Sequence, residues 1–108
     1  MTALRAEKDP GDVMRALSHA GRRRMLELVR DGERTSGELA ERCGMTAPAA
    51  SQHLRVLREA GLVRSRAVGN RRLHALRQER LADLRAFLDG FWGARLQALR
   101  EAVAEREP

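Results

Sequence analysis

The chain has 108 residues, which is enough for one domain with a modest core, and its single cysteine excludes an internal disulfide bond. Its formal net charge of +6 favours a polyanionic partner such as nucleic acid, because fixed positive charge attracts phosphates. The sequence contains no long apolar run and no leader of the secretory type. We therefore expect a cytoplasmic protein with no membrane partner.

Two short helices are predicted in the first third of the chain, where apolar residues recur at helical spacing. Val13 and Leu17 belong to the first helix, and residues 25–29 supply the apolar side of the second. The dipeptide Asp31-Gly32 then ends the second helix. Three consecutive arginines, 22–24, lie at its start and are expected to serve either phosphate binding or internal ion pairs.

A third and a fourth helix follow, separated by a turn. Thr35 with Glu38 three residues later forms a capping-box pattern that starts the third helix, and Gly44 stops it. Thr46 is expected to cap the fourth helix, which ends at Gly61. In the third helix, Cys43 shares an apolar face with Leu39, so we interpret it as a core residue; a redox-sensing thiol is the alternative.

A basic β-hairpin is predicted after the fourth helix. Residues 62–68 and 72–76 have strand character, and the turn dipeptide Gly69-Asn70 lies between them. Its arginines could clamp phosphates or enter a minor groove: Arg64, Arg66, Arg71 and Arg72.

The last helix is expected over about 78–105 and carries a long apolar stripe with all three aromatic residues of the chain. The stripe is longer than so small a domain can cover, so we interpret it as a dimer seam formed together with the first helix. The alternative is that the helix completes the core of a monomer. The predicted interface residues are Val13, Leu17, Leu84, Leu88, Phe91, Trp92, Leu96 and Leu99.

Residues 35–60 together have the arrangement of a helix-turn-helix, which places its second helix in the major groove of DNA. Ala50, Leu54 and Leu57 would face the core, which leaves a short polar face for base edges. An ordinary solvated helix face is the alternative for these polar residues. The predicted DNA contacts are Thr46, Ala47, Pro48, Ser51, Gln52, His53, Arg55, Asn70, Arg71 and Arg72.

The run from Asp12 to Leu76 resembles the DNA-binding core of ArsR-type repressors, and SQHLRVLREAGLV is its most specific piece. The segment LDGFWGARLQAL also resembles the closing helix of the metal-independent branch. This resemblance implies a mainly α (α+β) winged helix-turn-helix of about five helices, with residues 62–77 as the wing. It also implies a homodimeric repressor of operator DNA, with helices 11–18 and 78–105 as the dimer contacts and Ser51 and Gln52 as the main base readers.

Metal-sensing members of that family carry cysteines in the third helix, where this sequence has Thr35 and Gly37. Its last helix has no histidine, and His19, His53 and His74 show no paired spacing for a divalent metal. We therefore expect no metal site and no cofactor. The dipeptide Ala20-Gly21 also departs from the family pattern, which puts the cap of the second helix in doubt.

Other classes of function have less support. No carboxylate pair, nucleophile with a base, or phosphate-binding glycine loop indicates an enzyme. A basic protein-interaction module that uses the amphipathic last helix is the main alternative, and RNA binding is the third. No pocket for an inducer can be assigned from the sequence.

Overall fold

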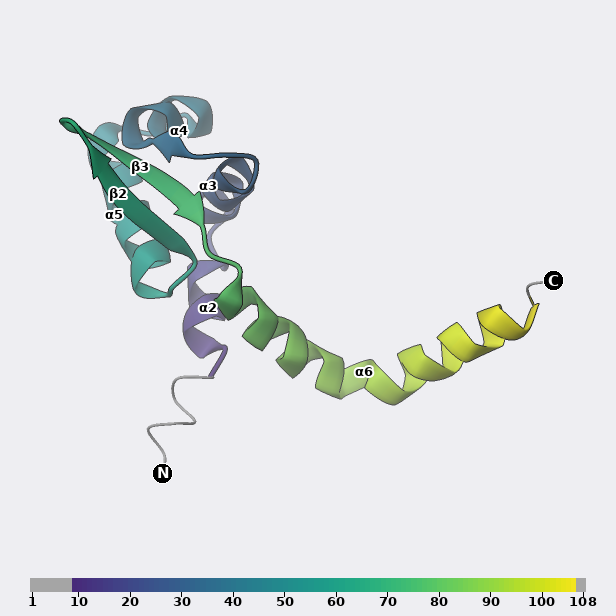
Figure 1. The fold of residues 1–108 in the computed structure, drawn as a ribbon. Coiled ribbons are helices and arrows are strands. Elements are labelled where there is room, and N and C mark those ends of the chain that lie inside the picture. The colour runs from purple at the N-terminus through teal and green to yellow at the C-terminus, as the bar shows by residue number, and fades with distance from the viewer. Residues whose placement is uncertain (1–8, 107–108) are drawn as a thin grey trace.

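The computed structural model describes residues 9–106, and its chain path is shown in Figure 1. Five helices and a three-stranded antiparallel sheet form a winged helix-turn-helix, which confirms the expected fold. The helices are α2 (Gly11–Ala16), α3 (Ala20–Arg30), α4 (Ser36–Cys43), α5 (Ala47–Glu59) and α6 (Glu79–Arg106). The strands are β1 (Arg34–Thr35), β2 (Val63–Val68) and β3 (Arg71–Leu76).

Helix α4 begins with the capping box that the sequence predicts. The Thr35 hydroxyl accepts the backbone N–H of Glu38 at 3.1 Å, and the Glu38 carboxylate accepts the backbone N–H of Thr35 at 2.8 Å. The hydroxyl of Thr46 similarly accepts the backbone N–H of Ala49 at 3.2 Å and caps α5. These side chains satisfy N–H groups that have no partner inside their helices.

The cap of α3, which the dipeptide Ala20-Gly21 had put in doubt, comes from a histidine. Nδ1 of His19 accepts the backbone N–H of Gly21 at 3.0 Å. A Cβ atom on Gly21 would lie 2.5 Å from the terminal methyl of Met45 and 3.1 Å from the His19 ring. Glycine therefore allows the start of α3 to lie close to the turn between α4 and α5.

The sheet has the order β1-β3-β2, and its first strand was not predicted from the sequence. Arg34 pairs with His74 across β1 and β3, and Ser65 pairs with His74 across β2 and β3. At the tip of the hairpin, Gly69 has φ +63°, whereas Asn70 has a negative φ. The predicted turn is thus confirmed, but only its glycine takes the unusual backbone angle.

One core holds the helices and the base of the sheet together. Its largest fully buried apolar side chains are Met25, Leu39, Leu54, Leu57, Leu62 and Val13. Val13 was predicted to contact a second copy, but in this structure its side chain has no exposed surface and packs inside the protomer. Short α2 is held in the core by such residues, so that prediction does not agree with the structure.

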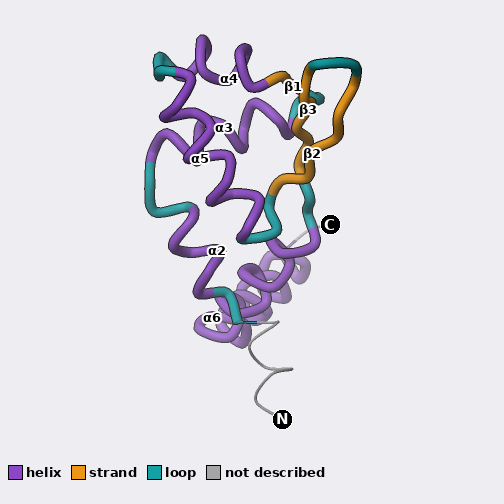
Figure 2. The backbone as a smooth tube through the Cα atoms, turned by 90° about the vertical axis from the view of Figure 1, so that its left-hand side faces the viewer, coloured by secondary structure: helices purple, strands orange, loops and turns teal. Residues whose placement is uncertain are grey.

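Helix α6 runs away from the rest of the domain (Figure 1). Its start lies beside α2 (Figure 2), and Leu81 and Leu84 pack against the core. None of its residues is buried, and Phe91 is 71% exposed. Completion of the monomer core therefore accounts only for the beginning of this helix. Within residues 9–106, no helix is long and apolar enough to cross a membrane.

Candidate nucleic-acid interface

The helix-turn-helix consists of α4, a turn and α5, and α5 is divided into a buried side and an open side. Ala50, Leu54 and Leu57 are buried against the core. Residues at the N-terminal half of the opposite side are exposed: Thr46, Ala47, Pro48, Ser51 and Gln52. A helix N-terminus with exposed N–H groups and short side chains can approach a DNA backbone closely.

Arg55 is also exposed and forms an ion pair with Glu59 one turn further along α5, with Nε 3.1 Å from Oε2. Both side chains are largely in solvent, where such a pair contributes little to stability. The guanidinium of Arg55 can therefore leave Glu59 for a phosphate at small cost.

His53 is placed differently from the other predicted contacts of α5. It is partly buried, its ring centroid lies 4.4 Å from that of His19, and its Nδ1 lies 3.2 Å from Nη1 of Arg22. Burial lowers the pKa of His53 below its ordinary value, and the nearby His19 and Arg22 lower it further. The structure thus joins His53 to α3 through its Nδ1, not to the open face.

The hairpin of β2 and β3 forms the wing (Figure 1). Asn70 lies in its turn, and Arg71 and Arg72 follow directly in β3; all three are exposed. Cross-strand partners share a face of a sheet, and successive residues alternate between faces. Arg72 pairs with Ala67 and so lies on the face of His74, whereas Arg71 lies on the other face. The two arginines therefore extend from opposite sides of one hairpin.

Another arginine of the hairpin, Arg66, forms a surface ion pair with a residue of the same chain. Arg66 binds Glu33 through two hydrogen bonds, Nε–Oε2 at 2.8 Å and Nη2–Oε1 at 2.9 Å. The hydrogen bond from Arg66 is the main reason that the pKa of Glu33 lies below its ordinary value. Arg66 thus ties β2 to the segment before β1, a role that sequence spacing could not reveal.

The arginine run 22–24 makes contacts within the chain, of which only that of Arg24 is an ion pair. Arg22 reaches the end of α2, where its Nε donates to the carbonyl of Ala16 at 2.6 Å. Nη1 of Arg23 donates to the carbonyl of Leu17 at 2.8 Å, and Arg24 pairs with Glu27 at 3.5 Å.

His74 is the one buried polar side chain of the described core, and no pattern in the sequence indicated its role. It lies between the wing and α4, with the hydroxyls of Ser65 and Ser36 at its two ring nitrogens. Burial lowers the pKa of His74, with smaller effects from Arg58 and Arg72. His74, Ser65 and Ser36 come from β3, β2 and α4, and they meet only when the strands pair beside α4.

Within residues 9–106, no group of three or more histidines, cysteines or acidic residues could hold a metal ion. The structure does bring His19 and His53 together, which the sequence spacing did not indicate. Cys43 is partly buried against the core, and burial raises the pKa of its thiol. A thiol in that state is a weak nucleophile and a poor metal ligand, in agreement with the interpretation as a core residue.

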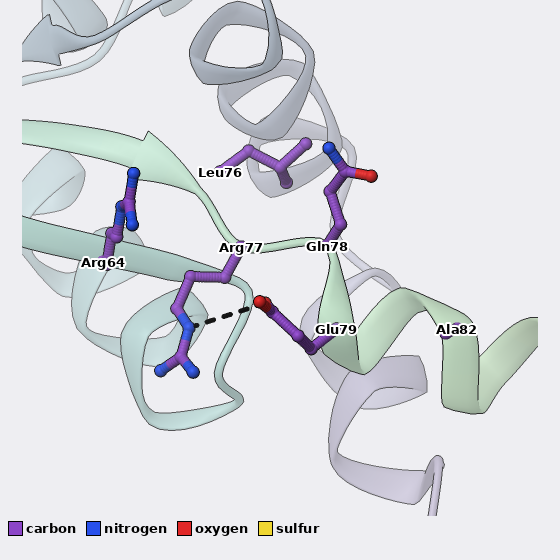
Figure 3. A pocket seen from close by; sticks show the side chains of 6 residues that line it. All are labelled: Arg64, Leu76, Arg77, Gln78, Glu79 and Ala82. Atoms are coloured by element: carbon purple, nitrogen blue, oxygen red, sulfur yellow. Dashed lines mark ion pairs between the residues drawn. The ribbon is translucent and has the colours of Figure 1, made fainter.

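A hollow of about 640 Å³ lies where the wing meets the start of α6 (Figure 3). Arg64 and Arg77 border it from the side of the sheet, and Gln78 and Glu79 border it from the helix. Arg77 Nε lies 3.8 Å from Glu79 Oε1, so the two charges are paired in part. Its lining side chains are exposed or half-buried, so the hollow is a surface feature beside the wing.

This fold, with an open recognition helix beside a basic wing, is that of a DNA-binding transcriptional regulator. The family model described as "Bacterial regulatory protein, arsR family" matches residues 19–65. The chain is 38% identical over 96 residues to the HTH-type transcriptional regulator Rv2034 of Mycobacterium tuberculosis, covering 89% of this chain and 90% of that protein. The chain belongs to the ArsR family of transcriptional regulators, and it is not an enzyme.

Two further relatives are informative. The transcriptional repressor SdpR of Bacillus subtilis is 31% identical, over 67% of this chain and 80% of its own length. The solution structure of the homodimeric winged helix-turn-helix domain Mb0332 from Mycobacterium bovis, a possible ArsR-family regulator, is 29% identical. It superimposes with a TM-score of 0.67 and covers 90% of this chain and 89% of that domain.

Proposed function

We propose that the protein is a homodimeric repressor that binds operator DNA without a metal ion, with α5 in the major groove and the wing on the neighbouring backbone. The observation that carries this proposal is the division of α5. Its core side is fully packed, while Ser51 and Gln52 are exposed beside the helix N-terminus. Serine and glutamine side chains can read base edges by hydrogen bonds.

The proposed roles within this site differ. Ser51 and Gln52 read bases, while Thr46, Ala47 and Pro48 bring the backbone close to the DNA. Further contacts to phosphates come from the exposed cationic and amide side chains: Arg55, Asn70, Arg71 and Arg72. Phosphate contacts fix the position of the protein, and base contacts specify the sequence.

The proposed dimer is built by α6 with α2. Several large apolar side chains of α6 are exposed in the protomer, from Phe87 to Val103. An isolated domain seldom leaves so long a row of apolar residues exposed to water, so we assign a second copy of this chain as the partner that buries the row. The predicted contacts that are accessible are Leu17, Leu84, Leu88, Phe91, Trp92, Leu96 and Leu99. The homodimeric state of the related Mycobacterium bovis domain supports this assignment.

Repression is proposed for two reasons. A dimer bound to an operator blocks access of other proteins to that DNA, and SdpR, which this chain matches over 80% of the length of SdpR, is named as a repressor. Metal independence is proposed because Thr35 is occupied in the capping box, and the thiol of Cys43 is partly buried. Zinc binding would require thiolates or imidazoles that converge on one point.

The proposal can be tested by selecting the DNA sequences that the protein binds from a random pool. The purified full chain is incubated with a pool of random-sequence duplexes, bound duplexes are recovered and sequenced, and the enriched site is footprinted. A two-fold symmetric sequence is expected, followed by repression of a reporter that carries it within its promoter. Recovery of no enriched sequence, with binding that depends only on salt, would contradict sequence-specific recognition.

The exposed face of α6 also fits a second candidate, a module that binds another protein through this amphipathic helix. The two proposals differ in what covers the apolar row. A chain that stays monomeric alone and selects no DNA sequence would favour this second candidate.

A further inference from the structure

Residues 17–19 separate short α2 from α3, and the last carbonyl groups of α2 have no partner within that helix. The carbonyl of Arg15 accepts from the backbone N–H and the hydroxyl of Ser18, at 3.2 and 2.7 Å, and Arg22 contacts both it and the carbonyl of Ala16. Its Nε donates to the carbonyl of Ala16 at 2.6 Å, and its Nη2 donates to the carbonyl of Arg15 at 3.1 Å. One guanidinium therefore caps α2 from the first turn of α3.

The same guanidinium extends to the recognition helix, since its Nη1 lies 3.2 Å from Nδ1 of His53 on α5. A guanidinium can only donate hydrogen bonds, so Nδ1 of His53 must be the acceptor, and the ring proton is then on Nε2. Arg22 thus connects the end of α2 with the middle of α5. The planar fork of arginine suits this task because its donors point in fixed directions.

A second histidine supports the contact. The ring of His19 lies 4.4 Å from the ring of His53, tilted by 45°. Its Nδ1 is already an acceptor for the backbone N–H of Gly21. Both histidines therefore accept a hydrogen bond at Nδ1 in this structure, and protonation of His53 at Nδ1 would remove its bond with Arg22.

The charged groups around this contact come from α2, α3 and α5. Asp12 and Arg15 on α2 are paired with each other, and Glu59 on α5 is paired with Arg55. Asp12, Arg15, Arg22 and Glu59 line a hollow between the three helices. Among these groups Arg22 is the one within hydrogen-bond distance of His53, and its positive charge opposes protonation of the ring.

We propose that Arg22 and His53 form a clip that holds recognition helix α5 in a fixed position relative to α2, and that protonation of His53 at Nδ1 opens it. His53 is then a positioning residue for DNA binding. This inference rests on the proposed function, in which α5 reads the DNA and α2 lies at the dimer contact. The clip would make the relative position of these two elements depend on pH.

The consequence for DNA binding has a definite sign. Burial and the neighbouring His19 and Arg22 lower the pKa of His53, so the clip is closed above the ordinary histidine range and opens as the solution becomes acidic. A histidine that instead contacted a phosphate would bind more tightly when protonated. The two roles of His53 therefore predict opposite pH dependence.

The first experiment needs no DNA. Histidine side-chain nitrogen NMR of the full chain from pH 8 to pH 5 should show neutral His53 as the Nε2–H tautomer, with its signal assigned by its loss in His53→Asn. The Arg22→Gln variant should lose this tautomer preference, and its His53 should titrate at a higher pH. The matched control is Arg23→Gln, because Arg23 donates to the Leu17 carbonyl and has no hydrogen bond or ion pair with α5 among the described residues, so His53 should titrate there as in the parent. An Nδ1–H tautomer in the parent would overturn the clip.

The second experiment measures affinity for a duplex selected by the parent from random sequences, between pH 7.5 and pH 5.5. The amide oxygen of His53→Asn can accept from Arg22 but cannot be protonated in this range. Affinity of the parent should fall by about three- to tenfold on acidification, as expected for loss of one hydrogen bond, while His53→Asn should keep most of its affinity. Equal pH profiles, or tighter binding of the parent in acid, would overturn the proposal. If no duplex is selected, the proposed function fails, and the NMR result alone decides on the clip.

Discussion

Ser65 and His74 face each other across the two strands of the wing, and Oγ of Ser65 lies 2.7 Å from Nδ1 of His74. On the other side of the ring, Oγ of Ser36 lies 2.8 Å from Nε2. Since a hydroxyl can donate or accept, the neutral imidazole has both nitrogens satisfied. One buried ring thus joins β2, β3 and the first turn of α4, and so connects the wing with the helix-turn-helix.

This arrangement predicts that the folded state loses stability between pH 7.5 and pH 5. The pKa of His74 is lowered by burial, so above the ordinary value of 6.5 the ring is neutral in both the folded and the unfolded chain. Below it, the unfolded chain takes up the proton first, and the free energy of unfolding falls until the folded ring is protonated as well. One histidine can contribute a slope of at most about 1.4 kcal/mol per pH unit.

Urea unfolding at a fixed protein concentration checks this prediction, with the parent compared with His74→Gln. The variant should be less stable at pH 7.5, and its stability should change less with pH in this range. The lowered carboxylate pKa values of Glu33 and Glu38 act at lower pH and do not interfere. The same pH slope in both proteins would contradict the assignment to His74.

Replacement of Gln52 or Arg72 by alanine should change DNA binding in different ways, because Gln52 is proposed to read a base and Arg72 is proposed to contact a phosphate. Gln52→Ala should cost about 1–3 kcal/mol on the selected duplex and relax the preference at one base position. Arg72→Ala should weaken selected and random duplexes nearly equally and lower the salt slope by about one. Titrations of both variants on both duplexes across a salt series provide the measurement. Parent-like binding by Gln52→Ala would mean that another face of α5 reads the DNA.

The apolar residues of α6 should determine the oligomeric state. Phe91→Gln and Trp92→Gln each remove apolar burial worth about 2 kcal/mol per copy from the proposed interface, so dimer dissociation should rise by at least about tenfold. Sedimentation equilibrium at micromolar concentration measures this change. Gln97→Ala is the matched control, since Gln97 is an exposed polar residue of the same helix that bonds only to Glu101 among the described contacts. A parent that is monomeric at these concentrations would contradict the proposed dimer, which should bind two DNA half-sites about 34 Å apart or a multiple of that.

Zinc, cadmium and arsenite should leave the affinity for the selected duplex unchanged at stoichiometric concentration. The reason is chemical: these ions prefer thiolates, and the thiol of Cys43 is partly buried with its pKa raised by that burial. Fluorescence anisotropy with and without each ion measures the effect, and Cys43→Ser should behave as the parent does. Release of the duplex by one equivalent of any of these ions, abolished in Cys43→Ser, would show that the protein senses metal through this residue.

The local pattern of the sequence was sufficient to predict the helices, the caps of α4 and α5, and the hairpin. Thr35 with Glu38, and Thr46 alone, act on N–H groups within one helical turn, so their effect can be read from spacing. The apolar period likewise identifies the core side of α5, because burial selects one face of a helix wherever that helix packs. These features depend on neighbours only a few residues away.

Contacts between residues distant in the chain could not be derived in this way. Strand β1 is two residues long and exists only because β3 pairs with it, and Arg66 meets Glu33 only when the hairpin lies beside that strand. The contacts of Arg22 with Ala16 and His53 likewise required that α2, α3 and α5 be placed together. Val13 was predicted to be a dimer contact because the apolar period shows which face of a helix is buried. The period does not show whether the same chain or a second copy buries that face, and in the structure the same chain does.

The sequence by itself therefore determined the five helices, the hairpin, the helix-turn-helix and the family, since these rest on local spacing and on residue types, whereas β1 did not follow from it. The tertiary structure alone decided the environments of the three histidines. His53 faces Arg22 and His19, whereas His74 lies buried between two serines. The physical reason is that hydrogen bonding and desolvation act over a few ångströms in space, and the chain brings such neighbours together only by folding.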